Sequence, residues 1–204
     1  MFYDILDKKR LDIMPLLGKL KADFYLAGGT ALALQIGHRD SIDFDFFSFN
    51  DFDPQELFMR LEEIFKEHKI IKVQEERNTL TVFIDDEIKI SFFGFAYKLI
   101  MPKQDEEYLC LASIEDIACM KLSAILSRAT NKDYIDLYFI IKKIKLAHLI
   151  ELAQKKLPAI DSNLILKSLV YFEDVSIEPI NFKHGHEVEF DEVKKELIRV
   201  VKDN

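Results

Sequence analysis

The first half of the chain is a series of short apolar segments separated by polar or glycine residues, a pattern typical of β-strands. Strands are predicted over residues 24–27, 43–48, 70–73, 79–84 and 88–93, with shorter ones around 99–100 and 108–111. Helical patterns precede or separate these strands over residues 1–20, 30–36 and 54–68. Asp53 and Pro54 predict the start of the third helix, because the carboxylate can cap it and proline presets its first turn.

From Ser113 onward the apolar positions follow a helical period. Ser113 and Asp116 predict a capped helix that ends near Ser127. Further helices are predicted over residues 131–143, 146–157, 161–173 and 190–202. Strands followed by helices indicate the α+β class, with a mixed sheet flanked by helices and then a C-terminal helical bundle. We expect a catalytic core over residues 1–107, a mainly helical domain over residues 108–204, and a linker near residues 104–107.

Composition narrows the class of protein. The chain has 204 residues, and 49% of them are apolar, which is enough to bury a core in each of two domains. No segment approaches the ~20 apolar residues of a membrane helix, and charged residues interrupt the first ten positions, unlike those of a signal peptide. Cys110 and Cys119 fit neither a disulfide framework nor a Cys-x-x-Cys pair. We therefore expect a cytoplasmic protein with two buried thiols and no membrane partner.

The net charge of −8 argues against a protein that coats nucleic acid without specificity, because attraction to phosphates drives such binding. The charge is unevenly distributed. Residues 38–63 contain eight acids and two bases, whereas residues 117–156 contain eight bases and three acids. Two interpretations stay open: solvated helix faces, or a metal-binding half and a phosphate-binding half.

Two segments of the first half carry candidate chemistry. Gly28, Gly29 and Thr30 join an apolar strand to a helix start, and such a turn directs free backbone N–H groups at an anion. Asp43 and Asp45 lie two positions apart in the next strand, so both carboxylates face one side, roughly 6–7 Å apart along the backbone. Paired carboxylates suit Mg²⁺ or Mn²⁺. The two segments together predict phosphoryl or nucleotidyl transfer.

These residues, together with a second block, resemble a known family. The first block comprises the Gly-Gly-Thr turn, the His-Arg-Asp-Ser sequence at residues 38–41 and the strand at residues 43–47; the second comprises residues 121–128 and 132–137. In this order and spacing they resemble the nucleotidyltransferases of the AbiEii/AbiGii toxin family, within the polymerase-beta-like nucleotidyltransferase superfamily. The resemblance spans roughly residues 24–140. It implies a nucleotidyltransferase-type sheet and a helical domain that completes the active site.

The resemblance also implies roles for the first block. Asp43 and Asp45 would be catalytic ligands of Mg²⁺ or Mn²⁺, and NTP would be the substrate. The implied nucleotide-binding residues are Gly28, Gly29, Thr30 and Ser41. Ser41 could instead only support its loop. Arg39 is as consistent with a structural pair to Asp40 or Asp43 as with a substrate contact.

In the second block, Lys121 and Arg128 lie two helical turns apart on one face. The resemblance implies that Lys121 is catalytic and that Arg128 binds nucleotide, both neutralising triphosphate charge. The alternative is that the two cations only extend from a half-buried helix into solvent. Asp136 is implied as a catalytic residue and Asp133 as its support. Either carboxylate could instead form a buried pair with Lys121 or Arg128.

One position departs from the superfamily pattern. Many members carry a third carboxylate on a later strand, and alternation along residues 88–93 places Ser91 there, facing the same side as Asp43 and Asp45. The leading hypothesis is transfer of a nucleoside monophosphate to an RNA hydroxyl, as in tRNA, or to a protein hydroxyl. The resemblance adds a toxin role in a toxin–antitoxin or phage-defence pair, with a cognate antitoxin. The alternative is a nucleotide-binding regulatory protein with a degenerate site that acts through a partner.

Overall fold

The computed structural model describes residues 1–94 and 98–203 and divides into two units. The first unit comprises Met1–Ile36, Ser41–Lys98 and Pro102–Ala112. The second unit comprises Gly37–Asp40, Leu99–Met101 and Ser113–Asn204. The chain thus leaves the first unit for the last time after Ala112. The sequence had suggested a division after residue 107. The expected linker is wrong in its location, because Gln104–Asp105 form strand β6 of the first unit.

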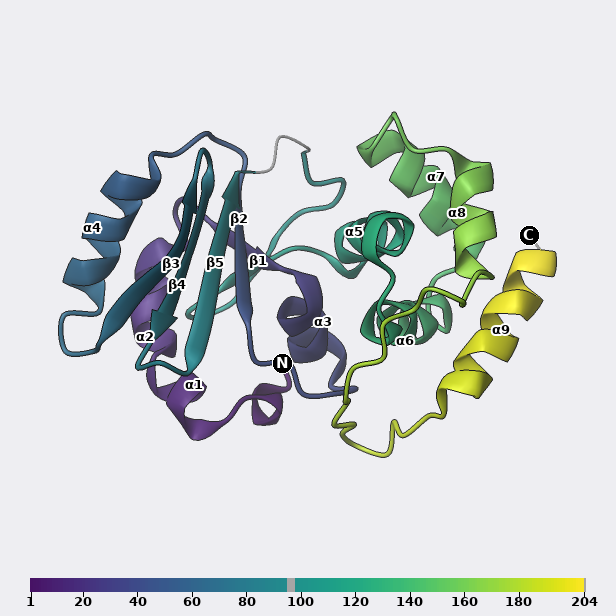
Figure 1. Cartoon of the computed structure of the whole chain (residues 1–204), viewed down its shortest axis with the longest axis horizontal. Coiled ribbons are helices and arrows are strands. Elements are labelled where there is room, and N and C mark those ends of the chain that lie inside the picture. The colour runs from purple at the N-terminus through teal and green to yellow at the C-terminus, as the bar shows by residue number, and fades with distance from the viewer. Residues whose placement is uncertain (95–97, 204) are drawn as a thin grey trace. The chain divides into compact units, whose positions relative to one another are not determined.

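The first unit contains a mixed seven-stranded sheet in the order β3-β4-β5-β2-β1-β7-β6 (Figure 1). Its strands are β1 (Tyr25–Ala27), β2 (Phe44–Ser48), β3 (Ile70–Glu76), β4 (Thr79–Ile84), β5 (Ile88–Gly94), β6 (Gln104–Asp105) and β7 (Cys110–Leu111). The pairs β2–β5 and β1–β7 are parallel, and the other pairs are antiparallel. The predicted mixed sheet is therefore confirmed.

One face of this sheet is the core of the first unit. Phe44 and Phe46 of β2 are buried on it, beside Ile90 and Phe92 of β5. The rings of Phe46 and Phe92 stack with centroids 5.5 Å apart. Helix α4 (Pro54–Ile64) lies beside β3 and β4 (Figure 1). Because strand residues alternate between faces, the residues between these phenylalanines point to the opposite face.

The single helix expected over residues 1–20 is wrong. The segment forms η1 (Tyr3–Ile5), α1 (Lys8–Asp12), α2 (Met14–Leu17) and η2 (Gly18–Leu20). The Asp7 side chain caps α1 by accepting a hydrogen bond from the Arg10 backbone, and Pro15 occupies the first turn of α2. These two residues mark new helix starts, and so they divide the apolar pattern into short helices.

The second unit is helical, as predicted. It contains α5 (Ile114–Arg128), α6 (Asn131–Ile141), α7 (Leu146–Lys156), α8 (Ser162–Leu169) and α9 (Phe190–Lys202). Ser113 caps α5 and Thr130 caps α6, each by accepting from a backbone N–H three residues on. The strand expected near residues 99–100 is wrong, because the backbone N–H groups of Ile100 and Met101 donate to the Asp116 carboxylate instead.

Candidate functional site

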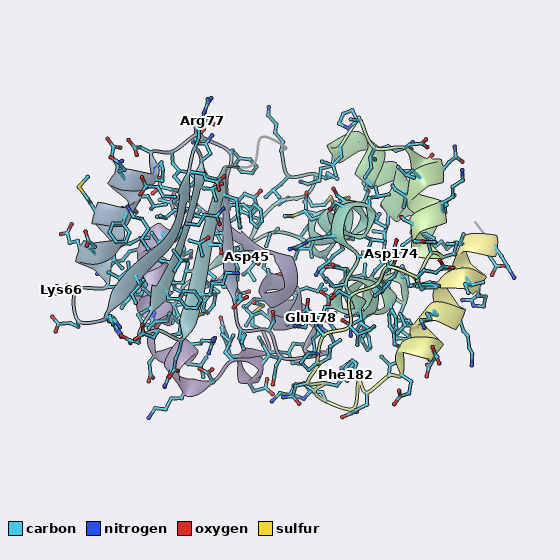
Figure 2. All side chains as sticks on the ribbon, viewed as in Figure 1. Asp45, Lys66, Arg77, Asp174, Glu178 and Phe182 are labelled. Atoms are coloured by element: carbon cyan, nitrogen blue, oxygen red, sulfur yellow. The ribbon has the colours of Figure 1, made fainter. Side chains whose placement is uncertain are left out.

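The turn between β1 and α3 (Gly28–Ile36) brings a backbone segment against a carboxylate of β2. Gly28 has φ +72°, a left-handed conformation that glycine adopts without steric cost. A β-carbon at Gly28 would lie only 3.2 Å from Oδ2 of Asp45. Figure 2 shows Asp45 on the sheet, close to the start of α3. The Asp45 carboxylate therefore lies at the end of α3 where the first N–H groups, which have no intrahelical partner, and the helix dipole favour anions.

A row of polar residues crosses the sheet from Asp45. The strand register aligns Asp45 with Ser91, Ser91 with Thr81, and Thr81 with Gln74. The Thr81 hydroxyl oxygen lies 3.4 Å from the Ser91 hydroxyl oxygen and 3.4 Å from Oε1 of Gln74. Neighbouring strands are about 4.8 Å apart, so Ser91 lies beside Asp45 on the same face. The prediction that Ser91 and Asp45 face the same side of the sheet is confirmed.

Asp43 precedes β2, and its carboxylate reaches the same face. Oδ2 of Asp43 lies 3.9 Å from Nζ of Lys89, and both side chains are partly exposed. Lys89 lies two positions before Ser91 on β5, and so the two residues share a face by alternation. The contact with Lys89 therefore supports the prediction that Asp43 and Asp45 point to one side.

Thr30 and Ser41 stabilise the segment that leads into β2. The buried Thr30 hydroxyl donates to the backbone carbonyl of Asp43 and lies 2.8 Å from the Ser41 hydroxyl oxygen. These contacts fix the loop that carries Asp43. The same contacts occupy the Thr30 and Ser41 hydroxyls, which were predicted to bind the nucleotide. A direct contact between either hydroxyl and a phosphate therefore stays a prediction.

The donor set of this face suits a divalent ion that also binds a nucleotide. Asp43 and Asp45 contribute carboxylates, and Ser91 contributes a hydroxyl. Residues 1–94 and 98–203 contain no group of three His, Cys, Asp or Glu side chains able to hold a metal. Mg²⁺ commonly binds through one or two carboxylates, several waters and the substrate phosphates. Two carboxylates beside an anion-favouring helix end therefore fit Mg²⁺ or Mn²⁺ with an NTP.

The second unit contains a buried charge cluster, formed by His38, Arg39, Lys121, Asp133 and Asp136. Asp136 is 0% exposed and accepts from Nε (2.7 Å) and Nη2 (2.8 Å) of Arg39. It also contacts Nε2 of His38 at 2.7 Å and Nζ of Lys121 at 2.6 Å. Burial alone would raise the pKa of Asp136, but the charges of Arg39 and Lys121 outweigh it and hold that pKa well below its usual value.

This cluster settles two of the alternatives left by the sequence. Arg39 pairs with the Asp136 carboxylate, and only the backbone carbonyl of Asp40 accepts from its Nη1, at 2.9 Å. The expected carboxylate partners of Arg39, Asp40 and Asp43, are therefore wrong. Lys121 forms the buried pairs that were the alternative to an exposed cation.

Lys121 remains charged although it is only 8% exposed. Its Nζ donates to Oδ1 of Asp133 at 2.8 Å and lies 2.6 Å from Oδ2 of Asp136. Burial lowers the pKa of Lys121, but the two carboxylates more than compensate, so the net shift is upward. An ammonium group has three N–H donors, and the part of the chain that the structure describes supplies these two acceptors. These two contacts therefore account for two of the three donors of Lys121.

His38 is the member of the cluster that is neutral. It is 0% exposed, and burial lowers its pKa despite the hydrogen bond to Asp136. Because Asp136 is ionised, Nε2 of His38 carries the proton and donates. Among the described residues, Nδ1 of His38 has no hydrogen-bond partner. Two cations and two carboxylates then leave the cluster with no net charge. The sequence interpretation gave His38 no role. Its position directly before Arg39 is the sequence signal that could have placed it in this cluster.

Arg128 lies elsewhere in the second unit, at the exposed end of α5. It lines a pocket of about 470 Å³ together with residues of the α5–α6 turn and of residues 168–176. Tyr134 forms part of this pocket, and its hydroxyl oxygen lies 2.9 Å from the carbonyl oxygens of both Ser168 and Tyr171, which share its single proton. The predicted nucleotide contact of Arg128 stays a prediction.

No helix within residues 1–94 and 98–203 is both long and apolar enough to cross a membrane.

Known proteins resemble this chain in sequence and in fold. A family model described as "Nucleotidyl transferase AbiEii toxin, Type IV TA system" matches residues 16–203. An uncharacterized protein of Aquifex aeolicus is 43% identical over an alignment of 160 residues, which covers 76% of this chain and 77% of that protein. The fold is similar to JHP933 from Helicobacter pylori, with TM-score 0.59, 18% identity, and coverage of 97% and 92% of the two chains. It is also similar to the MenT4 nucleotidyltransferase toxin of Mycobacterium tuberculosis, with TM-score 0.63, 15% identity, and coverage of 95% and 82%.

Proposed function

Since the chain belongs to the AbiEii family of nucleotidyltransferase toxins, we propose that it transfers a nucleoside monophosphate from an NTP to a hydroxyl of RNA or protein. The observation that carries this proposal is the position of Asp45. Its carboxylate lies against the Gly28 turn at the start of α3 and beside Ser91 on the sheet. A metal-binding carboxylate next to an anion-favouring helix end is what a bound triphosphate requires.

The residues of the first unit have three roles in this proposal: phosphate binding, metal binding and support of the Asp43 segment. The backbone N–H groups of Gly28 and Gly29 bind the β- and γ-phosphates at the start of α3. Asp43 and Asp45 are the residues that would hold Mg²⁺ or Mn²⁺, and the ion would supply neutralisation of phosphate charge and a more acidic acceptor hydroxyl. Thr30 and Ser41 keep the Asp43 segment in place through the hydroxyl contacts described above.

The transfer exchanges one bond to phosphorus for another. The acceptor oxygen bonds to the α-phosphorus while the bond from that phosphorus to the bridging oxygen breaks, and pyrophosphate leaves. The acceptor proton needs a base, and Ser91 occupies the place next to Asp45 where a third carboxylate would act. The proton therefore passes to water or to the substrate itself, and we expect slow turnover.

The second unit contributes its cations in this proposal. Lys121 offers its third N–H donor to phosphate charge, and Arg128 supplies a second, exposed cation. Asp136 was expected to be catalytic, and its four donors leave it no free lone pair to act as a base. We propose that Asp136 positions Lys121 and Arg39 instead.

Family membership supports a toxin role with a cognate antitoxin as partner, and RNA such as tRNA is the proposed acceptor. One observation favours the alternative of a nucleotide-binding regulator that turns over weakly. This observation is the serine at position 91, because a site with two carboxylates can bind nucleotide without efficient activation of a hydroxyl. The two functions predict different results with an NTP labelled at the α-phosphate. Only a transferase would place that label on RNA or protein.

The test uses each of the four NTPs, labelled at the α-phosphate, with Mg²⁺ or Mn²⁺ and total cellular RNA or protein. Label on RNA or protein supports the proposal and identifies both the nucleotide and the acceptor. Nucleotide binding without label on either polymer would favour the regulator. Absence of both binding and labelling would contradict the two functions together.

A further inference from the structure

A row of aromatic residues lies next to the polar row on the same face of the sheet. The register aligns Tyr25 of β1 with Phe47 of β2, and Phe47 with Phe93 of β5. The rings of Tyr25 and Phe47 are stacked at 5.9 Å between centroids, and those of Phe47 and Phe93 are tilted by 35° at 5.3 Å. Phe49 extends the group, with its ring 5.1 Å from that of Tyr25. We call these four residues the aromatic row.

The aromatic row differs from the phenylalanine core of the first unit. Phe44, Phe46 and Phe92 point to the opposite face and are at most 2% exposed. In contrast, Phe47 and Phe93 are half-buried and Phe49 is 44% exposed, whereas Tyr25, at 1%, is the buried end of the row. Apolar rings that stay accessible beside charged residues offer a π-face to a ligand, whereas rings that only fill a core do not.

The order of features along β2 gives the site a direction. β1 runs antiparallel to β2, and it aligns Ala27 with Asp45 and Tyr25 with Phe47. The Gly28 turn therefore lies toward the start of β2, Asp45 lies in the middle, and the aromatic row lies toward the end. Successive rows are about 7 Å apart, since two strand residues span that distance.

A nucleotide has the same order of parts. The β- and γ-phosphates lie on one side of the α-phosphate, and the ribose and base lie on the other. With the terminal phosphates at the start of α3 and the α-phosphate at Asp45, the base lies over the end of β2. Aromatic side chains stack on every base, because each base has a π-face.

We propose that the aromatic row stacks on the base of the bound NTP, with Phe47 and Phe93 as the principal contacts. This inference rests on the proposed function of Asp43 and Asp45. It adds a base-binding part to the site, and it assigns that part to the sheet of the first unit. Stacking discriminates little between bases, so the row contributes affinity for any NTP and little preference for one of them.

The test compares a ligand that has a base with one that lacks it. Calorimetry measures binding of each NTP and of inorganic tripolyphosphate, both with Mn²⁺, to the wild type and to Phe47→Leu and Phe93→Leu. Leucine keeps most of the apolar volume, so folding is expected to persist, and thermal melting verifies it. Phe58→Leu is the matched control, because Phe58 is a half-buried ring of α4 in the same unit.

We expect Phe47→Leu and Phe93→Leu each to weaken NTP binding about fivefold or more and to leave tripolyphosphate binding unchanged. Phe58→Leu should change neither. Equal loss for both ligands, or unchanged NTP binding in both variants, would overturn the proposal while the wild type still binds NTP. A wild type that binds neither ligand would contradict the proposed function itself.

Discussion

Gly28 and Asp45 approach so closely that a β-carbon on the glycine would lie 3.2 Å from the carboxylate oxygen Oδ2. This contact joins the turn that begins α3 to β2, the strand that carries Asp45, one of the two carboxylates proposed to bind metal. Gly28 also has φ +72°, which other residues adopt only with strain. Two independent constraints therefore require glycine at this position, and one of them concerns the candidate site directly.

Gly28→Ala should lower both stability and nucleotide binding. We expect a loss of about 1 kcal/mol in the free energy of unfolding from the strained φ, and weaker binding of Mn²⁺ with NTP because Asp45 must move. Gly185→Ala is the matched control, since Gly185 has the same φ of +72° and no atom within 4 Å of the added carbon. Chemical denaturation and calorimetry measure the two effects. Equal nucleotide binding in both variants would argue against the role of this contact.

Ser91→Asp should create a three-carboxylate site beside Asp45. Without metal we expect a lower melting temperature, because Ser91 is 2% exposed and the new charge would be buried next to Asp45. Mn²⁺ should then raise the melting temperature of the variant more than that of the wild type. Thr81→Asp, one strand further along the polar row, is the control. A variant that responds to Mn²⁺ no more than the wild type does would refute the alignment of Ser91 with the missing acid.

Lys121→Met and Lys156→Met should separate stability from catalysis. Lys156 is a buried lysine paired with Asp116 at 2.7 Å, just as Lys121 is paired with Asp133 and Asp136. Each change leaves a buried carboxylate without its cation, so each should cost about 3–5 kcal/mol of stability. At a temperature where both variants are folded, only Lys121→Met should lose transfer activity. Equal activity in the two variants would mean that Lys121 is structural.

Stability should decrease as the pH falls below about 6.5, the unperturbed pKa of histidine. Burial lowers the pKa of His38 in the folded protein, so the unfolded chain binds the proton first. The contribution of His38 is therefore complete above the unfolded pKa and is lost as the pH falls toward the folded one. Protonation would also add a positive charge beside Arg39 and Lys121, in a cluster whose two cations and two carboxylates balance only while His38 is neutral.

His38→Gln keeps a donor for Asp136 and removes the titration. We expect a smaller drop in melting temperature between pH 7 and 5 for this variant than for the wild type. His68→Gln is the control, because His68 is partly exposed and pairs with Asp85 at the surface of the first unit. Parallel pH profiles for wild type and His38→Gln would show that another group controls acid stability.

The parts of the fold that the sequence predicts are those set by local patterns. Alternation of apolar residues placed Asp45 and Ser91 on one face, and the cap signals at Asp53 and Ser113 located α4 and α5. Local signals were also decisive where the prediction was wrong, since Asp7 and Pro15 divide the first helix. In the segment before α5, however, the backbone of Ile100 bonds to Asp116, 16 residues away. A hydrogen bond between residues so far apart leaves no periodic pattern in the sequence from which it could be predicted.

The pairing of Arg39 with Asp136 in the charge cluster was beyond prediction for the same reason. Arg39 and Asp136 are 97 residues apart, and only the folded chain brings the guanidinium and the carboxylate together. The sequence offered Asp40 and Asp43 as nearer partners, which are more probable on spacing alone. Burial decides the outcome, because an ion pair without solvent needs the complete set of donors that His38, Arg39 and Lys121 supply to Asp136.

Transfer of label from the α-phosphate, but not from the γ-phosphate, tests the central claim most directly. The wild type is incubated with NTP labelled at one position or the other, with Mg²⁺ and total RNA or protein, beside Asp43→Asn, Asp45→Asn and the exposed control Asp51→Asn. The account predicts α-label on the polymer for the wild type and Asp51→Asn, none for the other two variants, and no γ-label with any of them. Undiminished α-labelling by both Asp43→Asn and Asp45→Asn, or transfer of the γ-label, would contradict it.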